Sequence, residues 1–263
     1  MDQGGGGSGA QKRKRSTGVY RGKYAQGGGK KATAAGGDGR AMQMQNDGSV
    51  KGVMFTCSPH RMREASLEAL AVLRTCIADH FTSGGGGGGG GTLDPLEAEL
   101  ASLREQRELL RPVTIGIKGC VLIAFTGADA DPERVVVQIM RDVVSGATPK
   151  PRHLLRLTPL QRTCRASVED FTKACSVPGA LGALRNSPPT TYRVSLRKRF
   201  CDDTVDRAEY YSAVGAIVGA RHKVDLDGAE VSVLVEIFKS SVGFSVTKEW
   251  RALSEFSLAK ITA

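Results

Sequence analysis

Aromatic residues and long hydrophobic runs are both scarce in this sequence of 263 residues. Aromatic side chains make up 5% of the chain, with a single tryptophan. No apolar stretch approaches the roughly 18–20 residues needed to cross a bilayer, and no charged-then-apolar signal peptide opens the chain. We therefore expect a soluble intracellular protein with no membrane partner.

Motifs that gather reactive or metal-binding side chains are also missing. The six cysteines include no C-x-x-C pair, and the four histidines are far apart in the sequence. Buried thiols are therefore expected in place of disulfides or a zinc site. Nucleophile elbows, phosphate loops, dinucleotide fingerprints and deaminase signatures are absent as well. The sequence predicts a protein that is not an enzyme, with no catalytic residues, metal or cofactor.

Glycine and basic residues dominate the first part of the chain. Residues 1–50 are glycine-rich and basic with few aliphatic side chains, so a disordered arm is predicted. Its basic cluster Lys12–Arg15 suits nuclear import and equally an RNA-contacting arm, and we expect a nuclear or nucleolar protein. The octaglycine Gly84–Gly91 lacks the spaced glycines of a phosphate loop and predicts a flexible insertion over 82–92.

Positive charge is concentrated in one internal block. The net charge is +10, and residues 150–199 hold 11 lysines and arginines against 2 acidic residues. A solvated basic face is one interpretation, but so strong an imbalance favours a polyanionic partner. Nucleic acid is preferred to an anionic membrane because no basic amphipathic helix of interfacial type is present.

Strand-like and helix-like patterns alternate along the chain, which indicates an α/β (α+β) class. Two modules are predicted, over 51–130 and 131–258. In the first long helix the apolar stripe is expected to consist of Leu67, Leu70, Ala71, Leu73 and Ile77. The expected helices are 61–81, 93–110, 131–144, 164–176 and 206–221, and the expected strands are 52–57, 113–117, 120–125, 151–158, 191–199, 231–238 and 242–248.

Arginines recur on one side of the predicted strands. Arg152 and Arg156 share one side of the strand before Pro159, which is expected to end the ladder because it has no N–H to donate. Thr163 is expected to cap the next helix, so that Arg162 and Arg165 join the same strand-to-helix corner.

A second row follows on the strand 191–199, where alternation predicts an exposed face. Cationic groups about 6–7 Å apart along a strand match the spacing of backbone phosphates, which favours recognition of RNA by shape. Glu236 is acidic within an apolar strand, and pairing with Lys239, Lys248 or a loop amide is preferred over a catalytic role. The candidate RNA-binding residues are Arg152, Arg156, Arg165, Arg193, Arg197, Arg199, Lys239 and Lys248.

The stretch 156–166, with the pattern R-x-x-P-x-x-x-T-C-x-A, resembles the stand-alone THUMP-domain proteins, adaptors of the eukaryotic tRNA cytidine acetyltransferase. The resemblance covers about 52–258 and includes 223–226, 233–239 and 245–248. It implies an N-terminal ferredoxin-like module before a THUMP module, which together bind the acceptor end of a tRNA. It also implies that the partner acetyltransferase forms N4-acetylcytidine in that tRNA.

The resemblance also assigns residues. It implies tRNA contacts for Arg156, Lys239 and Lys248, and structural roles for Pro159, Cys164 and Ala166. The sequence departs from the family in its octaglycine, which stands where relatives have a polar insertion, and in a C-terminus that ends just past the last strand. The oligomeric state is left open.

Two other functions stay open at this point. The basic arm also suits a general RNA-binding or ribosome-assembly protein. A tRNA-modifying enzyme is the other alternative, because THUMP modules are usually fused to catalytic domains. It is less favoured, since only 15 residues follow Lys248 and predicted disorder precedes Gly52.

Overall fold

The computed structural model describes residues 42–43, 50–81, 109–126, 131–177, 179–201 and 205–261, all of which lie in the unit Gly39–Ala263. Most of the predicted arm 1–50, the glycine insertion and nearly all of the predicted helix 93–110 lie outside these residues. In the part of the chain that is described, no helix is long and apolar enough to cross a membrane.

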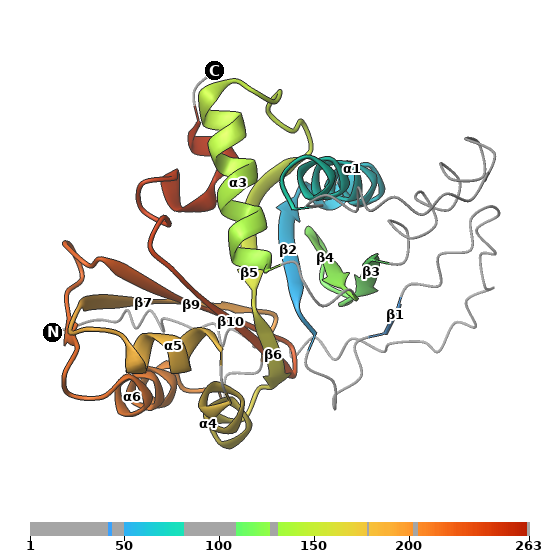
Figure 1. The fold of residues 1–263 in the computed structure, drawn as a ribbon. Coiled ribbons are helices and arrows are strands. Elements are labelled where there is room, and N and C mark those ends of the chain that lie inside the picture. The colour runs from blue at the N-terminus through green and yellow to red at the C-terminus, as the bar shows by residue number, and fades with distance from the viewer. Residues whose placement is uncertain are drawn as a thin grey trace, which may run out of the picture. The chain divides into compact units, whose positions relative to one another are not determined.

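The first half of the described chain forms a five-stranded sheet in the order β1-β3-β4-β2-β5. Its strands are β1 (Met42–Gln43), β2 (Gly52–Cys57), β3 (Leu110–Thr114), β4 (Cys120–Phe125) and β5 (Leu154–Leu160). β1 lies in the stretch predicted to be disordered. Two helices, α1 (Met62–His80) and α3 (Pro132–Ser145), pack on one face of this sheet (Figure 1). From β2 to β5 the order is β-α-β-β-α-β, so the expected ferredoxin-like module is confirmed.

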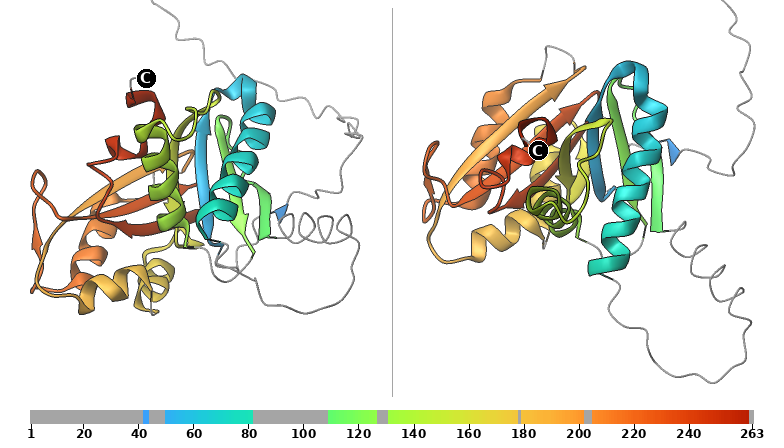
Figure 2. Two further views of the ribbon diagram at one scale, coloured as in Figure 1. Left: turned by 45° about the horizontal axis from the view of Figure 1, so that its top comes forward. Right: turned by 90° about the horizontal axis from the view of Figure 1, so that it is seen from above.

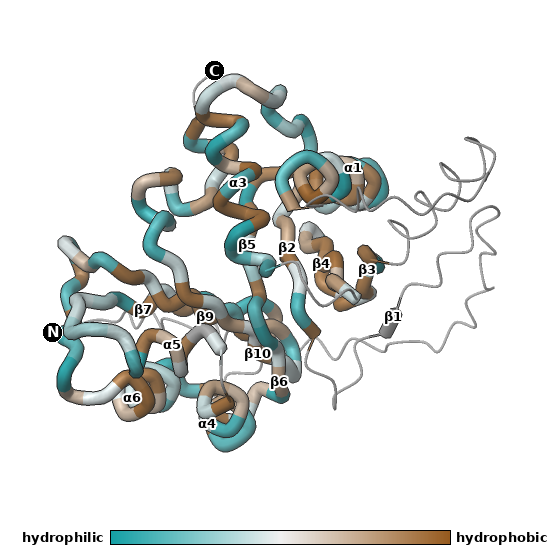
Figure 3. The backbone as a smooth tube through the Cα atoms, in the orientation of Figure 1, coloured by the Kyte–Doolittle hydropathy of each residue, from teal (hydrophilic) through white to brown (hydrophobic). Residues whose placement is uncertain are grey.

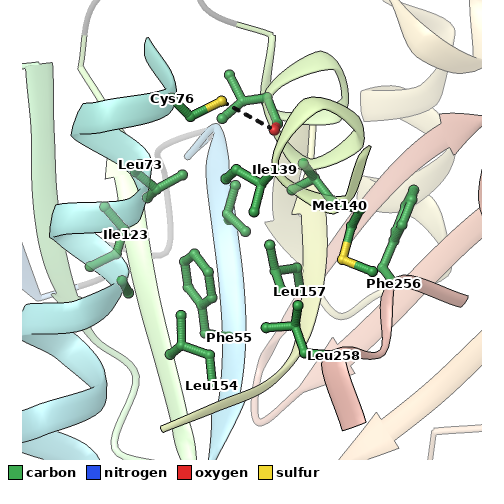
Figure 4. Packing of buried hydrophobic residues seen from close by; sticks show 14 of the residues in the cluster. Phe55, Leu73, Cys76, Ile123, Ile139, Met140, Leu154, Leu157, Phe256 and Leu258 are labelled. Atoms are coloured by element: carbon green, nitrogen blue, oxygen red, sulfur yellow. Dashed lines mark hydrogen bonds between the residues drawn. The ribbon is translucent and has the colours of Figure 1, made fainter. Parts of the chain in front are cut away.

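The core of this module lies between the two helices and the sheet (Figure 4). Leu73 of α1 and Ile139 of α3 face Phe55 of β2 across it. The Cys76 thiol donates to the Val135 carbonyl oxygen at 3.7 Å, which joins the two helices. β4 is buried along its whole length and is hydrophobic throughout (Figure 3).

The helix α3 begins where the sequence predicted. The Asp131 carboxylate accepts a hydrogen bond from the Glu133 N–H at 2.9 Å, and Pro132 occupies the first turn. Val135, Val136, Ile139 and Met140 of this helix are all buried.

The predicted apolar stripe of α1 was partly wrong. Leu73 is buried, and Leu70 and Ile77 pack against the core at its edge, but Leu67 is 62% exposed. The buried positions are Ala65, Ala69, Leu73 and Cys76. Small side chains let α1 lie close to the sheet, and hydrophobicity alone did not indicate them.

The second sheet has the order β6-β10-β9-β7-β8. Its strands are β6 (Arg162–Arg165), β7 (Thr191–Arg199), β8 (Lys223–Val224), β9 (Val231–Phe238) and β10 (Ser241–Thr247). The helices α4 (Val168–Ser176), α5 (Ala180–Asn186) and α6 (Arg207–Val218) cover one face (Figure 2). Phe171 lies 5.2 Å from Tyr210 and 5.4 Å from Phe244 between ring centroids. The mixed α/β class is thus confirmed. The helix α6 begins directly after Asp206, its predicted first residue, and the Asp206 carboxylate caps it by accepting from the Ala208 N–H.

The predicted strand-to-helix corner was wrong in two respects. Pro159 does not end the ladder but lies inside β5, opposite Val53, where an edge strand tolerates its missing N–H. Thr163 does not cap a helix, because it lies in β6 and accepts a hydrogen bond from the Val50 N–H at 2.7 Å. The cap of α4 is Ser167, whose hydroxyl accepts from the Asp170 N–H.

One residue, Gln161, connects the two sheets. β5 ends at Leu160 and β6 begins at Arg162, so the strands are continuous except at this position. The Gln161 side chain donates to the Asp131 carboxylate at 3.1 Å and accepts from the Val246 N–H at 2.9 Å. The division between the sheets therefore falls at Gln161, whereas the predicted domain boundary at 130/131 falls between β4 and α3.

After β10 the chain returns to the first module. This C-terminal segment, residues 248–261, contains the short 3-10 helices Ser254–Phe256 and Leu258–Lys260. Trp250, Phe256 and Leu258 are buried in the core formed by α1, α3 and the first sheet. A further 3-10 turn, Pro59–Arg61, precedes α1.

Candidate nucleic-acid interface

Two of the predicted RNA-binding arginines lie on β7 against a buried carboxylate. Arg197 is opposite Glu236 of β9, and its Nη1 lies 3.7 Å from Glu236 Oε1. Arg199 Nε donates to Glu236 Oε2 at 2.9 Å. The Glu236 side chain is 3% exposed and the two arginines 29% and 25%. The partners predicted for Glu236, Lys239 and Lys248, are therefore wrong.

A second carboxylate, Glu255 of the C-terminal segment, continues the cluster. Arg156 Nη1 donates to the Glu255 carbonyl oxygen at 2.7 Å, and the Glu255 carboxylate lies 3.9 Å from Arg197 Nη2 and 3.3 Å from Lys260 Nζ. Partial burial alone would raise the pKa of Glu255, but Lys260, Arg156 and Arg197 outweigh it and lower the pKa. We call Arg156, Arg197, Arg199, Lys260, Glu236 and Glu255 the ion cluster.

Arg193 also has a partner on the same side of β7. Its guanidinium carbon lies 5.0 Å from the centroid of the Trp250 ring, a cation–π contact with the C-terminal segment. The face of β7 that alternation predicted to be exposed is thus half-buried, because the C-terminal segment covers it. Alternation distinguishes two sides of a strand and says nothing about what covers each side. The RNA-binding role of these arginines stays a prediction.

The remaining predicted residues are exposed and lie at strand ends. Lys239 is in the β9–β10 turn, and Arg165 ends β6 opposite Ser241 of the same hairpin. Lys248 follows β10, and Arg152 precedes β5. These four cations do not form one patch by contact, but each is accessible to a charged partner.

Two hollows flank Gln161, with volumes of about 880 and 800 Å³. Both run between the first module and the helix α5 or the strand β10. The basic residues lining the first are Lys51, Arg162 and Arg185, and those lining the second are Arg134, Arg141 and Lys248.

Sequence reasoning missed Arg185 and Arg134. Nothing in their local pattern distinguishes them from any helix-surface arginine, and only the packing of α5 near α3 brings them to these hollows. Arg141 is less available than the others because it pairs with Glu249 at 3.1 Å.

Nucleophilic or metal chemistry finds little support in the described residues. Burial raises the pKa of the Cys76 and Cys164 thiols to about 12 and raises that of Cys175 further. Thiols of this kind are protonated at neutral pH and react slowly. Within the described ranges no group of three or more His, Cys, Asp or Glu residues is arranged to hold a metal ion.

Comparison with known proteins identifies a domain in the second half of the chain. Residues 181–247, from α5 to the end of β10, match the THUMP domain. The chain is 25% identical to THUMP domain-containing protein 1 of Bos taurus over 236 residues, which cover 82% of this chain and 64% of the relative. It is 27% identical to the tRNA acetyltransferase TAN1 of Saccharomyces cerevisiae over 140 residues, covering 48% and 47%.

Among solved structures, a 4-thiouridine synthetase in complex with RNA and ATP aligns with a TM-score of 0.40 at 12% identity, covering 75% of this chain and 41% of that one. The chain spans less than two thirds of the length of these relatives. The match to the domain lies on the second sheet, which carries Arg197, Arg199 and Glu236 of the ion cluster. The chain therefore contains a THUMP domain and is similar, over most of its length, to proteins named for that domain.

Proposed function

We propose that this chain is a tRNA-binding adaptor that presents tRNA to an N4-cytidine acetyltransferase. The observation that carries the proposal is the THUMP domain at 181–247, in a chain that is also similar to the tRNA acetyltransferase TAN1. The family resemblance adds that the acceptor end of the tRNA is the part bound. Excess positive charge over 150–199 supports a polyanionic ligand.

The proposed contact surface consists of the exposed cations at strand ends and of the basic residues around the hollows beside Gln161. Lys239 and Lys248 are the most accessible of them, since both are exposed at the ends of β9 and β10. Exposed lysines and arginines position a nucleic acid through its backbone and do not read its sequence. Binding is therefore expected to weaken steeply as salt concentration rises.

The adaptor role is tested in cells that lack the chain. N4-acetylcytidine in purified tRNA is measured by mass spectrometry before and after the full-length chain is restored. We expect the modification to be lost and then recovered. An unchanged level in the deletion strain would contradict the proposal.

A general RNA-binding function is separated by affinity. We expect the full chain to bind tRNA more tightly than hairpins of equal length and charge. Equal affinities at the same salt concentration would favour the general binder.

An enzymatic function is the other alternative, because the name of the yeast relative describes an acetyltransferase. The purified chain is incubated with tRNA and acetyl-CoA, with and without the partner acetyltransferase. We expect N4-acetylcytidine only when the partner is present. If the chain alone forms N4-acetylcytidine, it is an enzyme and the adaptor proposal is wrong.

We further propose that the protein is nuclear or nucleolar, and that the basic cluster Lys12–Arg15 directs it there. The cluster lies outside the described residues. A fluorescent fusion in which these four residues are changed to alanine is expected to lose nuclear accumulation, and an unchanged distribution would contradict the assignment.

A further inference from the structure

An aromatic ring stands in solvent at the end of β7. Phe200 is 70% exposed, the most exposed of the large hydrophobic side chains in the described part of the chain. Its φ is +51°, in the left-handed region that bulky residues rarely adopt. Single exposed hydrophobic residues are common and carry no meaning alone, but a strained backbone under an exposed ring is unusual.

The backbone on both sides of Phe200 is fixed. Arg199 is held by Glu236 through the hydrogen bond at 2.9 Å, and its carbonyl oxygen accepts from the Lys239 N–H at 3.2 Å. The Cys201 thiol donates to the Ile237 carbonyl oxygen at 3.1 Å. The ring is therefore presented outward from an anchored position.

Cations surround this end of the second sheet. Lys239, which also has a positive φ, lies in the neighbouring β9–β10 turn, and its ammonium lies beside Gly116 of the β3–β4 connection. Lys118 of that connection is exposed, as is Arg165 at the end of β6, opposite Ser241 of the same hairpin. Both modules thus contribute positive charge at the end of the second sheet where Phe200 is exposed.

This combination matches what single-stranded nucleic acid requires. An aromatic face stacks an unpaired base of any identity, while nearby ammonium and guanidinium groups hold the adjoining phosphates. A hydrophobic protein partner would be expected to prefer a wider apolar patch. No other large hydrophobic side chain with high exposure belongs to this strand end among the described residues.

We propose that Phe200 is a base-stacking residue, and that Lys239 with Lys118 holds the phosphates flanking the stacked base. The ligand is an unpaired nucleotide of an RNA. The inference rests on the proposed function in that the RNA is taken to be tRNA. Neither the alternation of β7 nor the family resemblance assigned this residue.

The test measures the affinity of the full chain for bulk tRNA by fluorescence anisotropy. Phe200→Ala is expected to raise the Kd roughly ten-fold, because stacking of one base on an aromatic ring contributes about that much. Phe200→Gly should do the same while relieving the left-handed strain, so it keeps the test valid if the alanine variant folds poorly. Phe200→Tyr should bind like the wild type.

Leu226→Ala is the matched control. Leu226 is 64% exposed and follows β8, which pairs with the start of β7, whereas Phe200 follows the end of β7. The Kd of this control should not change. Phe200→Trp offers a second readout, the tryptophan fluorescence. When tRNA is added, stacking should quench the fluorescence of the new indole, and this decrease should exceed any change that Trp250 shows in the wild type. Thermal unfolding confirms that each variant is folded.

The outcomes separate the two proposals. If the wild-type chain does not bind tRNA, the proposed function fails. If the wild type binds and both Phe200→Ala and Phe200→Gly bind equally well, the stacking role alone is wrong. Unchanged tRNA affinity with weakened binding to the acetyltransferase would make Phe200 a protein contact, which also overturns the stacking role.

Discussion

The basic residues of the second sheet fall into two groups that differ in what they already contact. On the face of β7, Arg197 and Arg199 are half-buried and paired with carboxylates. At the ends of strands, Lys239 and Lys248 are exposed and form no ion pair among the described residues. The difference teaches that a regular row of arginines in a sequence can form ion pairs within the fold, while cations outside such a row stay exposed.

Removing the buried carboxylate should have the largest effect. Glu236→Ala leaves two partly buried guanidiniums without their shared partner, and we expect a loss of about 3 kcal/mol in the free energy of unfolding. Denaturation in urea measures it. The control is Glu64→Ala, which removes an exposed pair with Arg61 and should leave stability unchanged. Equal behaviour of the two variants would mean that the ion cluster contributes nothing to stability.

Removing strand-end cations should act on binding instead. The double variant Lys239→Ala, Lys248→Ala is expected to weaken tRNA binding and to reduce the slope of log K against log salt by roughly 0.7–0.9 for each lost contact. Stability should not change. Arg197→Gln provides the comparison, because its paired side chain is expected to leave the slope unaltered. If Arg197→Gln reduces the slope and the lysine variant does not, the two groups have been assigned the wrong way round.

The second carboxylate of the cluster should show a smaller, pH-dependent effect. The pKa of Glu255 is lowered in the folded protein, so its contribution is present above the unfolded value near 4.5 and is lost as pH falls through the folded value. Glu255→Gln is expected to cost at most about 1 kcal/mol at neutral pH, since the pair is partly exposed. Urea denaturation from pH 7 to pH 3 measures it. A difference from wild type that grows as pH falls would contradict the pairing.

Buried thiols should have no effect at neutral pH and should affect stability only in alkali. The pKa of Cys76 is about 12 in the folded protein, above its ordinary value of 9.0. Its contribution is complete below pH 9 and is lost as pH rises toward 12. The wild type should lose stability over this range more than Cys76→Ala does. Rapid alkylation of Cys76 in the native protein at pH 8 would show that the thiol is not buried.

Local signals in the sequence predicted much of the fold. The start of α3 followed from Asp131 and Pro132, and that of α6 from Asp206, because capping depends on neighbouring residues alone. The strand β6 was missed because threonine is common both in strands and at helix caps, so the residues around Thr163 do not distinguish the two. Its pairing with β10 depends on residues nearly eighty positions away.

The candidate site was less predictable than the fold. The sequence shows that Arg197 and Arg199 lie on one side of a strand and that Arg156 lies on another strand. It does not show their partners Glu236 and Glu255, which come from other segments. Phe200 was unremarked because one aromatic residue among charged ones has no periodic signature. The alternation of residues along a strand does not show that a segment distant in the sequence packs over one of its faces.

The return of the C-terminal segment has a consequence for biosynthesis. Phe256 and Leu258 belong to the core of the first module but follow the entire THUMP domain in the chain. During synthesis, most of the ferredoxin-like module therefore leaves the ribosome before the last residues of its core have been translated. Until those residues emerge, Leu157 and Met140 lack part of their cover, and the nascent chain is expected to need protection from aggregation during that interval.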